Sequence, residues 1–244
     1  MQILKDIYMV LGGPYSNIAN IFIIKNHDSL VVMDTAEEGF EYDIIKENMA
    51  YWGLDQYPVT HILISHKHKN HIGNIWRFRQ DYPNVVVVAG DKDSDAIEKG
   101  ITNEICDFFP FPKKEDYVPQ KVDMRVKDLD TFEAAGIKFT VYEVPGHTDG
   151  SVFYQFEWEG KSVWLTGDVL NIEKDCDHAF LGWEGGMDYN RSLFYESVKR
   201  FSKFEGDIIL PGHYQLCMQN ATEIFNDSYR IPLEEWRIPG IDHE

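Results

Sequence analysis

The sequence predicts an α/β protein with four layers, helix–sheet–sheet–helix (αββα), built from two ββα halves. The chain has 244 residues, of which 43% are hydrophobic, and this supports a large packed core. Its apolar pattern runs through strands, a helix and a strand that ends at histidine, and this order occurs twice. Two such halves bury their sheets face to face with the helices outside. No stretch of linker composition divides them, so we expect one domain over residues 1–244.

The first half extends from the N-terminus to Ala89. Period-two alternation and β-branched residues predict strands at 7–11, 19–24, 29–34, 59–65 and 84–89. Apolar residues at the helical period predict helices over 41–52 and 72–82. The strand at 59–65 is apolar on both faces, which is typical of a strand between two layers, and it leads directly into a cluster of histidines.

The second half follows a less regular segment, residues 91–129. Pro110, Pro112 and Pro119 interrupt this segment, so we expect a short helix and then an irregular insertion over the core. The order of elements then returns, with strands expected at 137–144, 151–158, 162–166 and 207–210 and a helix at 190–204.

Acidic residues outnumber basic ones, 41 Asp+Glu against 23 Lys+Arg, which gives a formal net charge of −18. Nucleic-acid binding is driven by Lys and Arg that replace counterions on phosphate, so we expect no nucleic-acid partner. The apolar stretches are far shorter than the roughly 20 residues that cross a bilayer, and we expect no membrane partner. A small-molecule substrate fits best, and a homo-oligomer stays open.

The cysteines and the N-terminus favour the cytoplasm. Cys106, Cys176 and Cys217 are widely spaced with no CxxC pair, a usage typical of a reducing compartment. Lys5 and Asp6 stand where a secretory signal would need its apolar core. We therefore expect a cytoplasmic protein.

Three of the nine histidines, His66, His68 and His71, fall within six residues after the strand at 59–65. Imidazoles crowded at a strand end would repel one another if protonated, and would need separate hydrogen-bond partners if neutral. One metal ion satisfies them together. By period-two alternation His66 and His68 leave the strand on the same side, so both are candidate ligands.

Three further strands end at a glycine that precedes a side chain able to bind metal. These side chains are His147, Asp168 and His213. Glycine lets the backbone turn sharply, which brings the next side chain toward a shared point. A single Gly-His pair carries little information, but these segments and the histidine cluster together predict a metal centre.

This pattern resembles the metallo-β-lactamase superfamily of metal-dependent hydrolases, whose motifs are HxHxDH, a Gly-His, an Asp and a last His. The resemblance covers nearly the whole chain and implies the αββα fold of that family. It implies these ligands: His66, His68 and His147 for one ion, Asn70, His71 and His213 for a second, and Asp168 for both. Asp168 rather than cysteine at the bridging position is similar to the glyoxalase II and lactonase branch, and Asp34 resembles the family's buried aspartate.

The resemblance also implies one or two divalent ions per chain, zinc first, with manganese or iron as alternatives. Metal-activated hydroxide would then attack a small-molecule carboxylic ester, thioester or lactone, with phosphodiesters as a second class. Asp168 would orient the nucleophile. Tyr214, directly after His213, is a candidate oxyanion donor, with simple packing as the alternative. Residues 169–189 would form a loop over the metals, or a solvated loop.

Asn70 departs from the family motif, which has Asp at this position. An amide is a neutral, weaker ligand and cannot accept a proton. A unit charge beside a cation is worth about 4 kcal/mol at roughly 4 Å and an effective dielectric constant near 20. We expect a weakened second metal position and reduced or abolished catalysis. An engineered inactivating change, a natural variant with one metal, and a relative that has lost catalysis all stay open.

Two other functions fit the same residues. An oxidoreductase similar to the sulfur dioxygenases of this superfamily would hold a single iron with two histidines and Asp168, and would tolerate Asn70. A non-catalytic relative would keep the fold, with or without one ion. Iron with oxygen uptake would indicate the first, and metal without turnover would indicate the second.

Overall fold

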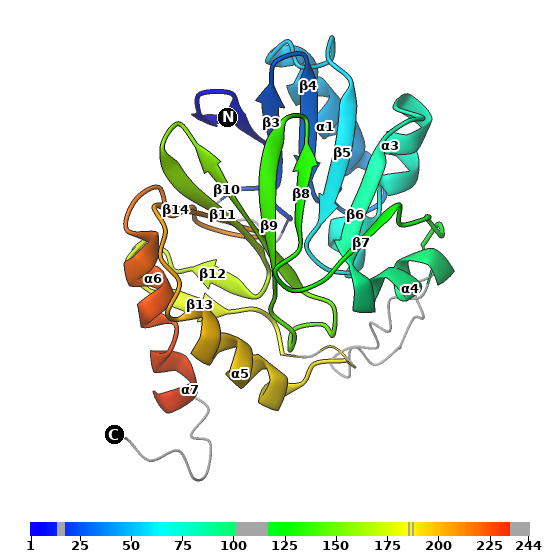
Figure 1. The fold of residues 1–244 in the computed structure, drawn as a ribbon. Coiled ribbons are helices and arrows are strands. Elements are labelled where there is room, and N and C mark those ends of the chain that lie inside the picture. The colour runs from blue at the N-terminus through cyan, green and yellow to red at the C-terminus, as the bar shows by residue number, and fades with distance from the viewer. Residues whose placement is uncertain (14–17, 101–116, 185, 187, 235–244) are drawn as a thin grey trace.

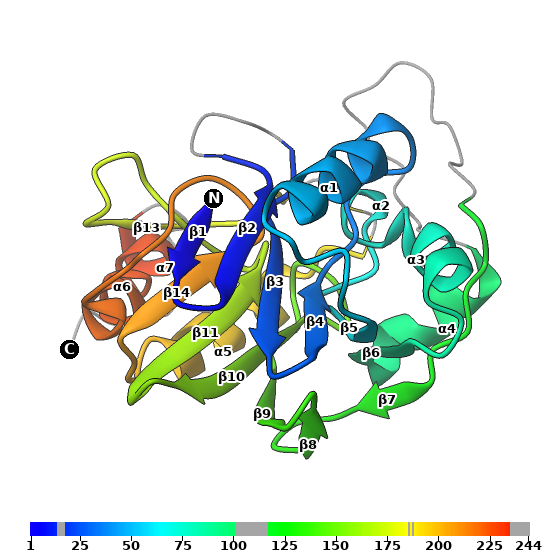
Figure 2. The same cartoon turned by 90° about the horizontal axis from the view of Figure 1, so that it is seen from above.

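Two β-sheets pack face to face at the centre of the protein, and helices cover their outer faces (Figures 1 and 2). Residues 1–13, 18–100, 117–184, 186 and 188–234 are described by the computed structural model. The expected four-layer αββα architecture is confirmed.

The first sheet has seven strands in the order β1-β2-β3-β4-β5-β6-β7. Their bounds are Gln2–Leu4, Ile7–Leu11, Ile21–Asn26, Ser29–Met33, Val59–Ile64, Val86–Gly90 and Met124–Val126. Strands β1 to β4 pair antiparallel, and β4 to β7 pair parallel. Because β4, β5 and β6 run in the same direction, the segments that follow them meet at one edge of the sheet.

The second sheet has five strands in the order β14-β11-β10-β9-β8. In that order their bounds are Ile208–Pro211, Lys161–Gly167, Val152–Trp158, Ile137–Glu143 and Thr131–Ala134. Strands β11 and β14 are parallel, with Gly167 opposite Pro211, so their carboxyl ends also lie side by side. A separate hairpin, β12 (Leu170–Ile172) and β13 (Ala179–Leu181), follows β11.

The helices form the two outer layers. Their bounds are Phe40–Tyr51 (α1), Lys69–Ile72 (α2), Ile75–Asp81 (α3), Asp91–Lys99 (α4), Arg191–Phe201 (α5), Ala221–Asp227 (α6) and Arg230–Glu234 (α7). Figure 2 shows α1, α3 and α4 on the outer side of the first sheet, while α5 and α6 lie beyond the second.

Strand alternation divides the apolar side chains among three cores. In β5, Ile62 and Ile64 face the helices and join a core that includes Ile45 of α1. Leu63 faces the other way, into the core between the sheets, where it joins Phe139. A third core lies between the second sheet and α5 and α6. The apolar run Ile62–Ile64 of β5 is therefore buried on both faces, whereas Thr60 and His61 earlier in the strand are partly buried.

The helix predicted over 72–82 is wrong in its start and continuity. α2 ends at Ile72, α3 begins at Ile75, and Gly73 and Asn74 lie between them. The Asn74 side chain donates to the main-chain oxygens of Thr35 and Glu37, at 2.8 and 2.6 Å. These bonds hold Asn74 in a loop conformation that competes with a continuous helix.

The expectation of a plain loop at 169–189 is also wrong, because this segment contains the β12–β13 hairpin. In the segment 91–129 the expected short helix is α4, and strand β7 follows later; residues 101–116 lie outside the described part. Strands β1 and β8 and helices α6 and α7 lie where the sequence pattern indicates no element. Each is short, from three to seven residues, and its pattern is correspondingly weak.

In the described part of the chain, no helix has the length and apolar character that a membrane crossing requires. Cys176 is exposed and Cys217 is buried, and both are free thiols. Cys106 lies outside the described residues.

Candidate metal centre

The segments after β5, β9, β11 and β14 bring the candidate ligands together at the edge where these strands end. His66 and His68 follow β5, and α2 carries Asn70 and His71. His147 lies between β9 and β10, Asp168 follows β11, and His213 follows β14. All but Asn70 are buried, none more than 9% exposed. The sequence therefore identified a set of residues that converges in three dimensions.

His66, His68 and His147 form a group that could hold one ion, because their ligand atoms lie within 4.8 Å of one another. Nε2 of His66 is 3.2 Å from Nε2 of His147. Ligands about 2.0–2.1 Å from a tetrahedral zinc ion lie about 3.3 Å apart, which this spacing matches. Within the described residues, buried Nε2 of His68 has no hydrogen-bond partner, as expected of an atom that awaits a metal.

Outer hydrogen bonds from Nδ1 orient three of the histidines, and for His66 and His147 they leave the lone pair on Nε2. The Ser65 hydroxyl donates to Asp34 at 2.8 Å, so it accepts from Nδ1 of His66, also at 2.8 Å. Nδ1 of His147 donates to the main-chain oxygen of Trp183 at 3.0 Å, and Nδ1 of His71 donates to Asp34 at 2.8 Å. A metal-binding histidine is oriented by this kind of outer hydrogen bond.

A second group surrounds Asp168. Its Oδ1 lies 3.2 Å from Nε2 of His71, and its Oδ2 lies 3.3 Å from Nε2 of His213. Oδ2 is also 3.9 Å from the Nε2 atoms of both His66 and His147. Asp168 thus lies between the two groups, the place that the resemblance assigns to a bridging ligand.

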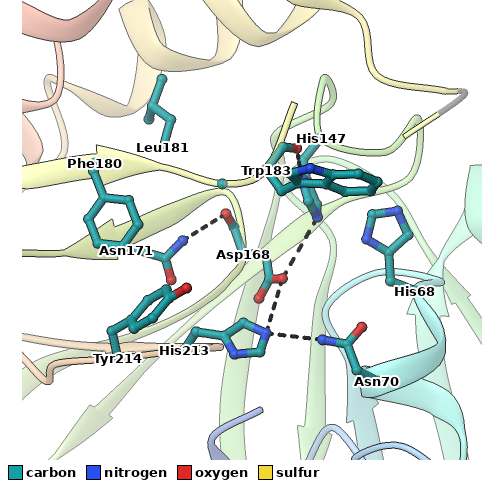
Figure 3. Close-up of a pocket in the computed structure, with 11 residues that line it drawn as sticks. His68, Asn70, His147, Asp168, Asn171, Phe180, Leu181, Trp183, His213 and Tyr214 are labelled. Atoms are coloured by element: carbon teal, nitrogen blue, oxygen red, sulfur yellow. Dashed lines mark hydrogen bonds and ion pairs between the residues drawn. The ribbon is translucent and has the colours of Figure 1, made fainter. Parts of the chain in front are cut away.

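Asn70 lies beside this second group. Its Nδ2 is 3.1 Å from Nε2 of His71 and 3.0 Å from Nε2 of His213. A carboxylate at this place would complete a charged ligand set, whereas the amide adds no charge. The structure therefore places Asn70 where the family motif has Asp, with the side chain directed at the other candidate ligands (Figure 3).

The histidines of the centre differ in their pKa values, because burial acts on all of them but nearby carboxylates act most strongly on His71. Burial and the neighbouring histidines hold the pKa values of His66 and His68 well below the ordinary value, and burial lowers the pKa of His147. Burial also lowers the pKa of His71, but Asp168 and Asp34 outweigh it and raise that pKa to about 10. The three-histidine group is therefore neutral and ready to bind a cation, while His71 is protonated without metal.

Glycines allow the strand ends to approach. Gly167 has a φ of +51°, in the left-handed region that favours glycine, and it turns the chain just before Asp168. Gly212 is needed for space, because a Cβ there would collide with Oδ1 of Asp168 and lie 3.0 Å from Cε1 of His71. The sequence-based expectation that glycine precedes the ligands for conformational reasons is confirmed at Gly167, whereas at Gly212 the reason is close packing.

A pocket of about 510 Å³ opens above the candidate ligands. His68, Asn70, His147, Asp168 and His213 form its floor (Figure 3). Its walls come from the segment after β11, the β13 end of the hairpin and the residue after His213: Asn171, Phe180, Leu181, Gly182, Trp183 and Tyr214. The segment expected to lie over the metals therefore does line the pocket, and Tyr214 lines it as well.

Two charged residues of the centre were not identified as functional from the sequence. Lys67 is buried, with Nζ 2.5 Å from Asp188 and 3.7 Å from Asp93. Asp93, in α4, is fully buried. Their only sequence signal is their place at the carboxyl ends of adjacent parallel strands, β5 and β6, and that signal does not show which side chains point inward.

The αββα fold and a His/Asp cluster at its strand ends define a class of proteins with a buried metal-binding centre between two sheets. A family model described as the metallo-beta-lactamase superfamily matches residues 16–213. The chain belongs to the metallo-beta-lactamase superfamily.

Curated relatives include two hydroxyacylglutathione hydrolases. The protein from Photobacterium profundum is 30% identical over 190 residues, which cover 78% of this chain and 58% of that protein. The protein from Bdellovibrio bacteriovorus is 26% identical over 215 residues, covering 83% of this chain and 69% of that protein. The chain thus matches only part of the length of these relatives.

Solved structures show the same fold at low identity. A subclass B3 metallo-beta-lactamase of Bradyrhizobium japonicum superposes with a TM-score of 0.73 at 18% identity, covering 97% of this chain and 92% of that one. A metallo-beta-lactamase of Cronobacter sakazakii, described by a HARLDQ motif, gives a TM-score of 0.67 at 16% identity, covering 87% and 72%.

Proposed function

We propose that the protein is a metal-dependent hydrolase of a small-molecule thioester, lactone or other carboxylic ester, with phosphodiesters as a second class. The observation that carries this proposal is the spacing of the ligand atoms. Nε2 of His66 lies 3.2 Å from Nε2 of His147. Asp168 lies 3.2 Å from Nε2 of His71 and 3.3 Å from Nε2 of His213. These distances suit nitrogen and oxygen ligands that share an ion.

The donor set favours zinc, with manganese or iron as alternatives. Neutral imidazole and carboxylate are ligands that all three ions accept, and zinc prefers the four-coordinate geometry that the three-histidine group supports. His66, His68 and His147, with Asp168, would hold the first ion. Asn70, His71 and His213 would share Asp168 with a second, weaker one.

A divalent ion held here supplies a hydroxide at neutral pH and polarises the substrate carbonyl. Burial alone would raise the pKa of Asp168, but His71 and His213 hold it well below its usual range, so Asp168 is ionised. Asp168 can therefore accept a hydrogen bond from the attacking water and orient it. Tyr214, in the pocket wall, can donate a hydrogen bond from its hydroxyl to the oxyanion that forms.

Asn70 limits this chemistry. A carboxylate at the same place could accept the proton that the attacking water loses, whereas an amide nitrogen or oxygen cannot. His71 and His213, its neighbours at 3.1 and 3.0 Å, are engaged by Asp168 and do not replace that base. We expect slower turnover than an Asp variant would give.

The substrate class follows from two observations. Two of the relatives are named hydroxyacylglutathione hydrolases, and an acyl group carried on the thiol of glutathione is a thioester. Phe180, Leu181 and Trp183 give one wall of the pocket an apolar surface suited to the carbon part of an acyl group. The net charge of −18 argues against nucleic-acid substrates, and the cysteine usage supports the cytoplasm as the place of action.

A panel of thioesters, lactones, carboxylic esters and phosphodiesters tests the proposal on protein loaded with zinc, manganese or iron. We expect cleavage of at least one carboxylic class, lost in His147→Ala. The matched control is His178→Ala, because His178 is exposed and lies outside the pocket lining. Metal binding without turnover on any class would indicate a non-catalytic relative, and oxygen uptake with bound iron would indicate the oxidoreductase instead.

A further inference from the structure

A fully buried carboxylate, Asp93, lies behind the three-histidine group. Asp93 belongs to the first turn of α4, which begins directly after β6. Since β6 is parallel to β5, the start of α4 lies beside the segment that carries His66 and His68. Asp93 is not among the residues that the resemblance implies as ligands, and it does not line the pocket.

The Asp93 carboxylate connects two of the segments that carry ligands. Its Oδ2 accepts a hydrogen bond from the main-chain nitrogen of Lys67 at 3.0 Å, and Lys67 lies between His66 and His68. The same oxygen accepts from Oγ1 of Thr148 at 2.7 Å, and Thr148 follows His147 directly. Oδ1 accepts from the main-chain nitrogen of Gly150 at 3.0 Å. One side chain thus fixes the backbone next to all three histidines.

The packing around Asp93 leaves little freedom. A Cβ on Gly150 would collide with the main-chain nitrogen of Asp93 and lie 2.6 Å from its Cγ, so only glycine fits there. Thr148 Oγ1 is also 2.7 Å from the Ser151 hydroxyl, which holds the turn after His147 closed. These contacts determine how far the His147 segment stands from the His68 segment.

The charge of Asp93 is balanced inside the protein. Lys67 Nζ lies 3.7 Å from Oδ1 of Asp93 and 2.5 Å from Oδ2 of Asp188. Two carboxylates therefore lie near one ammonium group. Burial raises the pKa of Asp93, and the positive charge of Lys67 opposes that rise.

Asp34 has the corresponding position for the other candidate ligands. It accepts from His71 directly and from His66 through Ser65, and within the described residues none of its side-chain hydrogen bonds reaches the His68 or His147 segment. Asp34 and Asp93 follow the neighbouring strands β4 and β6 on either side of β5. The two carboxylates support different ligands of the centre.

We propose that Asp93 is a positioning residue for the metal position formed by His66, His68 and His147, an inference that rests on the proposed metal binding. It holds His68 and His147 at the separation that an ion requires. Because Asn70 weakens the second position, metal binding measured on this protein reports mainly on the first position, which Asp93 supports.

The test is Asp93→Asn, which keeps the shape of the side chain but removes its charge. The new amide NH2 group would face a group that donates to Asp93 in the parent, so at least one hydrogen bond is lost. Titration with Co²⁺ gives the affinity, and the visible absorption bands of the bound ion report its coordination. We expect affinity roughly 10- to 100-fold weaker, the range measured for outer partners of metal ligands, and altered bands.

The matched control is Asp123→Asn. Asp123 also accepts a main-chain hydrogen bond, from Val87 at 3.0 Å, and it pairs with Arg79, away from the centre. We expect this variant to lose thermal stability while its Co²⁺ affinity and bands stay those of the parent. A merely structural role for Asp93 would make the two variants alike.

Parent affinity and parent bands in Asp93→Asn would overturn the inference and leave the proposed function standing. A parent protein that binds no ion would overturn the proposed function, and this inference with it. If Asp93→Asn does not fold by circular dichroism, Thr148→Val decides, because it removes one hydrogen bond to Asp93 and keeps the carboxylate. Weaker Co²⁺ binding in that variant supports the inference, and unchanged binding overturns it.

Discussion

Nδ2 of Asn70 lies 3.0 Å from Nε2 of His213. In the HxHxDH motif of the superfamily this position is an Asp, so a neutral amide here faces a histidine that would otherwise share a cation with a carboxylate. The three-histidine group on the other side of Asp168 has no such substitution. The centre is therefore unequal: one position keeps its full set of candidate ligands, and the other has lost a charge.

His71 is expected to be protonated at neutral pH in the metal-free protein. Burial lowers its pKa, but Asp168 and Asp34 raise it to about 10. Because this pKa is raised above the ordinary 6.5, His71 stabilises the metal-free fold fully below about pH 6.5, and the contribution is lost as the pH rises through about 10. NMR titration of the His71 ring gives the midpoint. A midpoint at or below 6.5 would contradict the electrostatic description of the centre.

Trp183→Ala is expected to raise KM roughly tenfold for substrates with an apolar acyl group, equivalent to about 1.4 kcal/mol of binding. The indole is 45% exposed and lines the pocket, so a substrate can bury it further. Metal content should not change, because the bond to His147 comes from the main chain of Trp183. Tyr51→Ala, on α1 and 78% exposed, is the control. An equal KM effect in both variants would remove Trp183 from the binding surface.

Gly212→Ala is expected to lower the metal content of the first position and the activity with it, because the new Cβ would displace Asp168, which both positions share, and press on His71. Gly160→Ala is the control: its φ of +77° makes alanine strained, by about 1–2 kcal/mol, but no atom lies within 4 Å of the added Cβ. Thermal melts and elemental analysis separate the two effects. Metal content and activity equal to those of the parent in Gly212→Ala would contradict this expectation, because the centre would then bind metal without the close approach of residue 212 to Asp168.

Tyr214→Phe distinguishes the two interpretations of Tyr214. If its hydroxyl donates to the oxyanion, kcat should fall roughly 100-fold or more with metal content unchanged. Tyr195→Phe, which removes a hydroxyl 3.2 Å from Tyr229 outside the pocket lining, should keep kcat. Unchanged kcat in Tyr214→Phe would assign this residue to packing alone.

The sequence was sufficient for the layers and for the convergence of the candidate ligands. Strand β2 has the predicted bounds, and strand 59–65 was one residue too long. Both are short runs rich in apolar and β-branched residues, which is the signal of a buried strand. The ligands could be placed because strand ends and glycines mark them, and parallel strands bring those ends to one edge.

Other features depend on tertiary contacts that periodicity does not encode. The break between α2 and α3 is fixed by Asn74 bonds to Thr35 and Glu37, which are distant in the sequence. The β12–β13 hairpin is held by three residue pairs, too few for a clear pattern. Asp93 is charged and lies in a helix whose other side is exposed, so nothing in its immediate sequence indicates that it is fully buried.

Metal content per chain tests the central claim most directly, measured by elemental analysis on the protein and on Asn70→Asp prepared identically. We expect about one ion in the protein and about two in Asn70→Asp, with faster turnover in the variant, because the carboxylate restores a charged ligand beside His71 and His213. About two ions in both would contradict it, since Asn70 would then leave the second position intact.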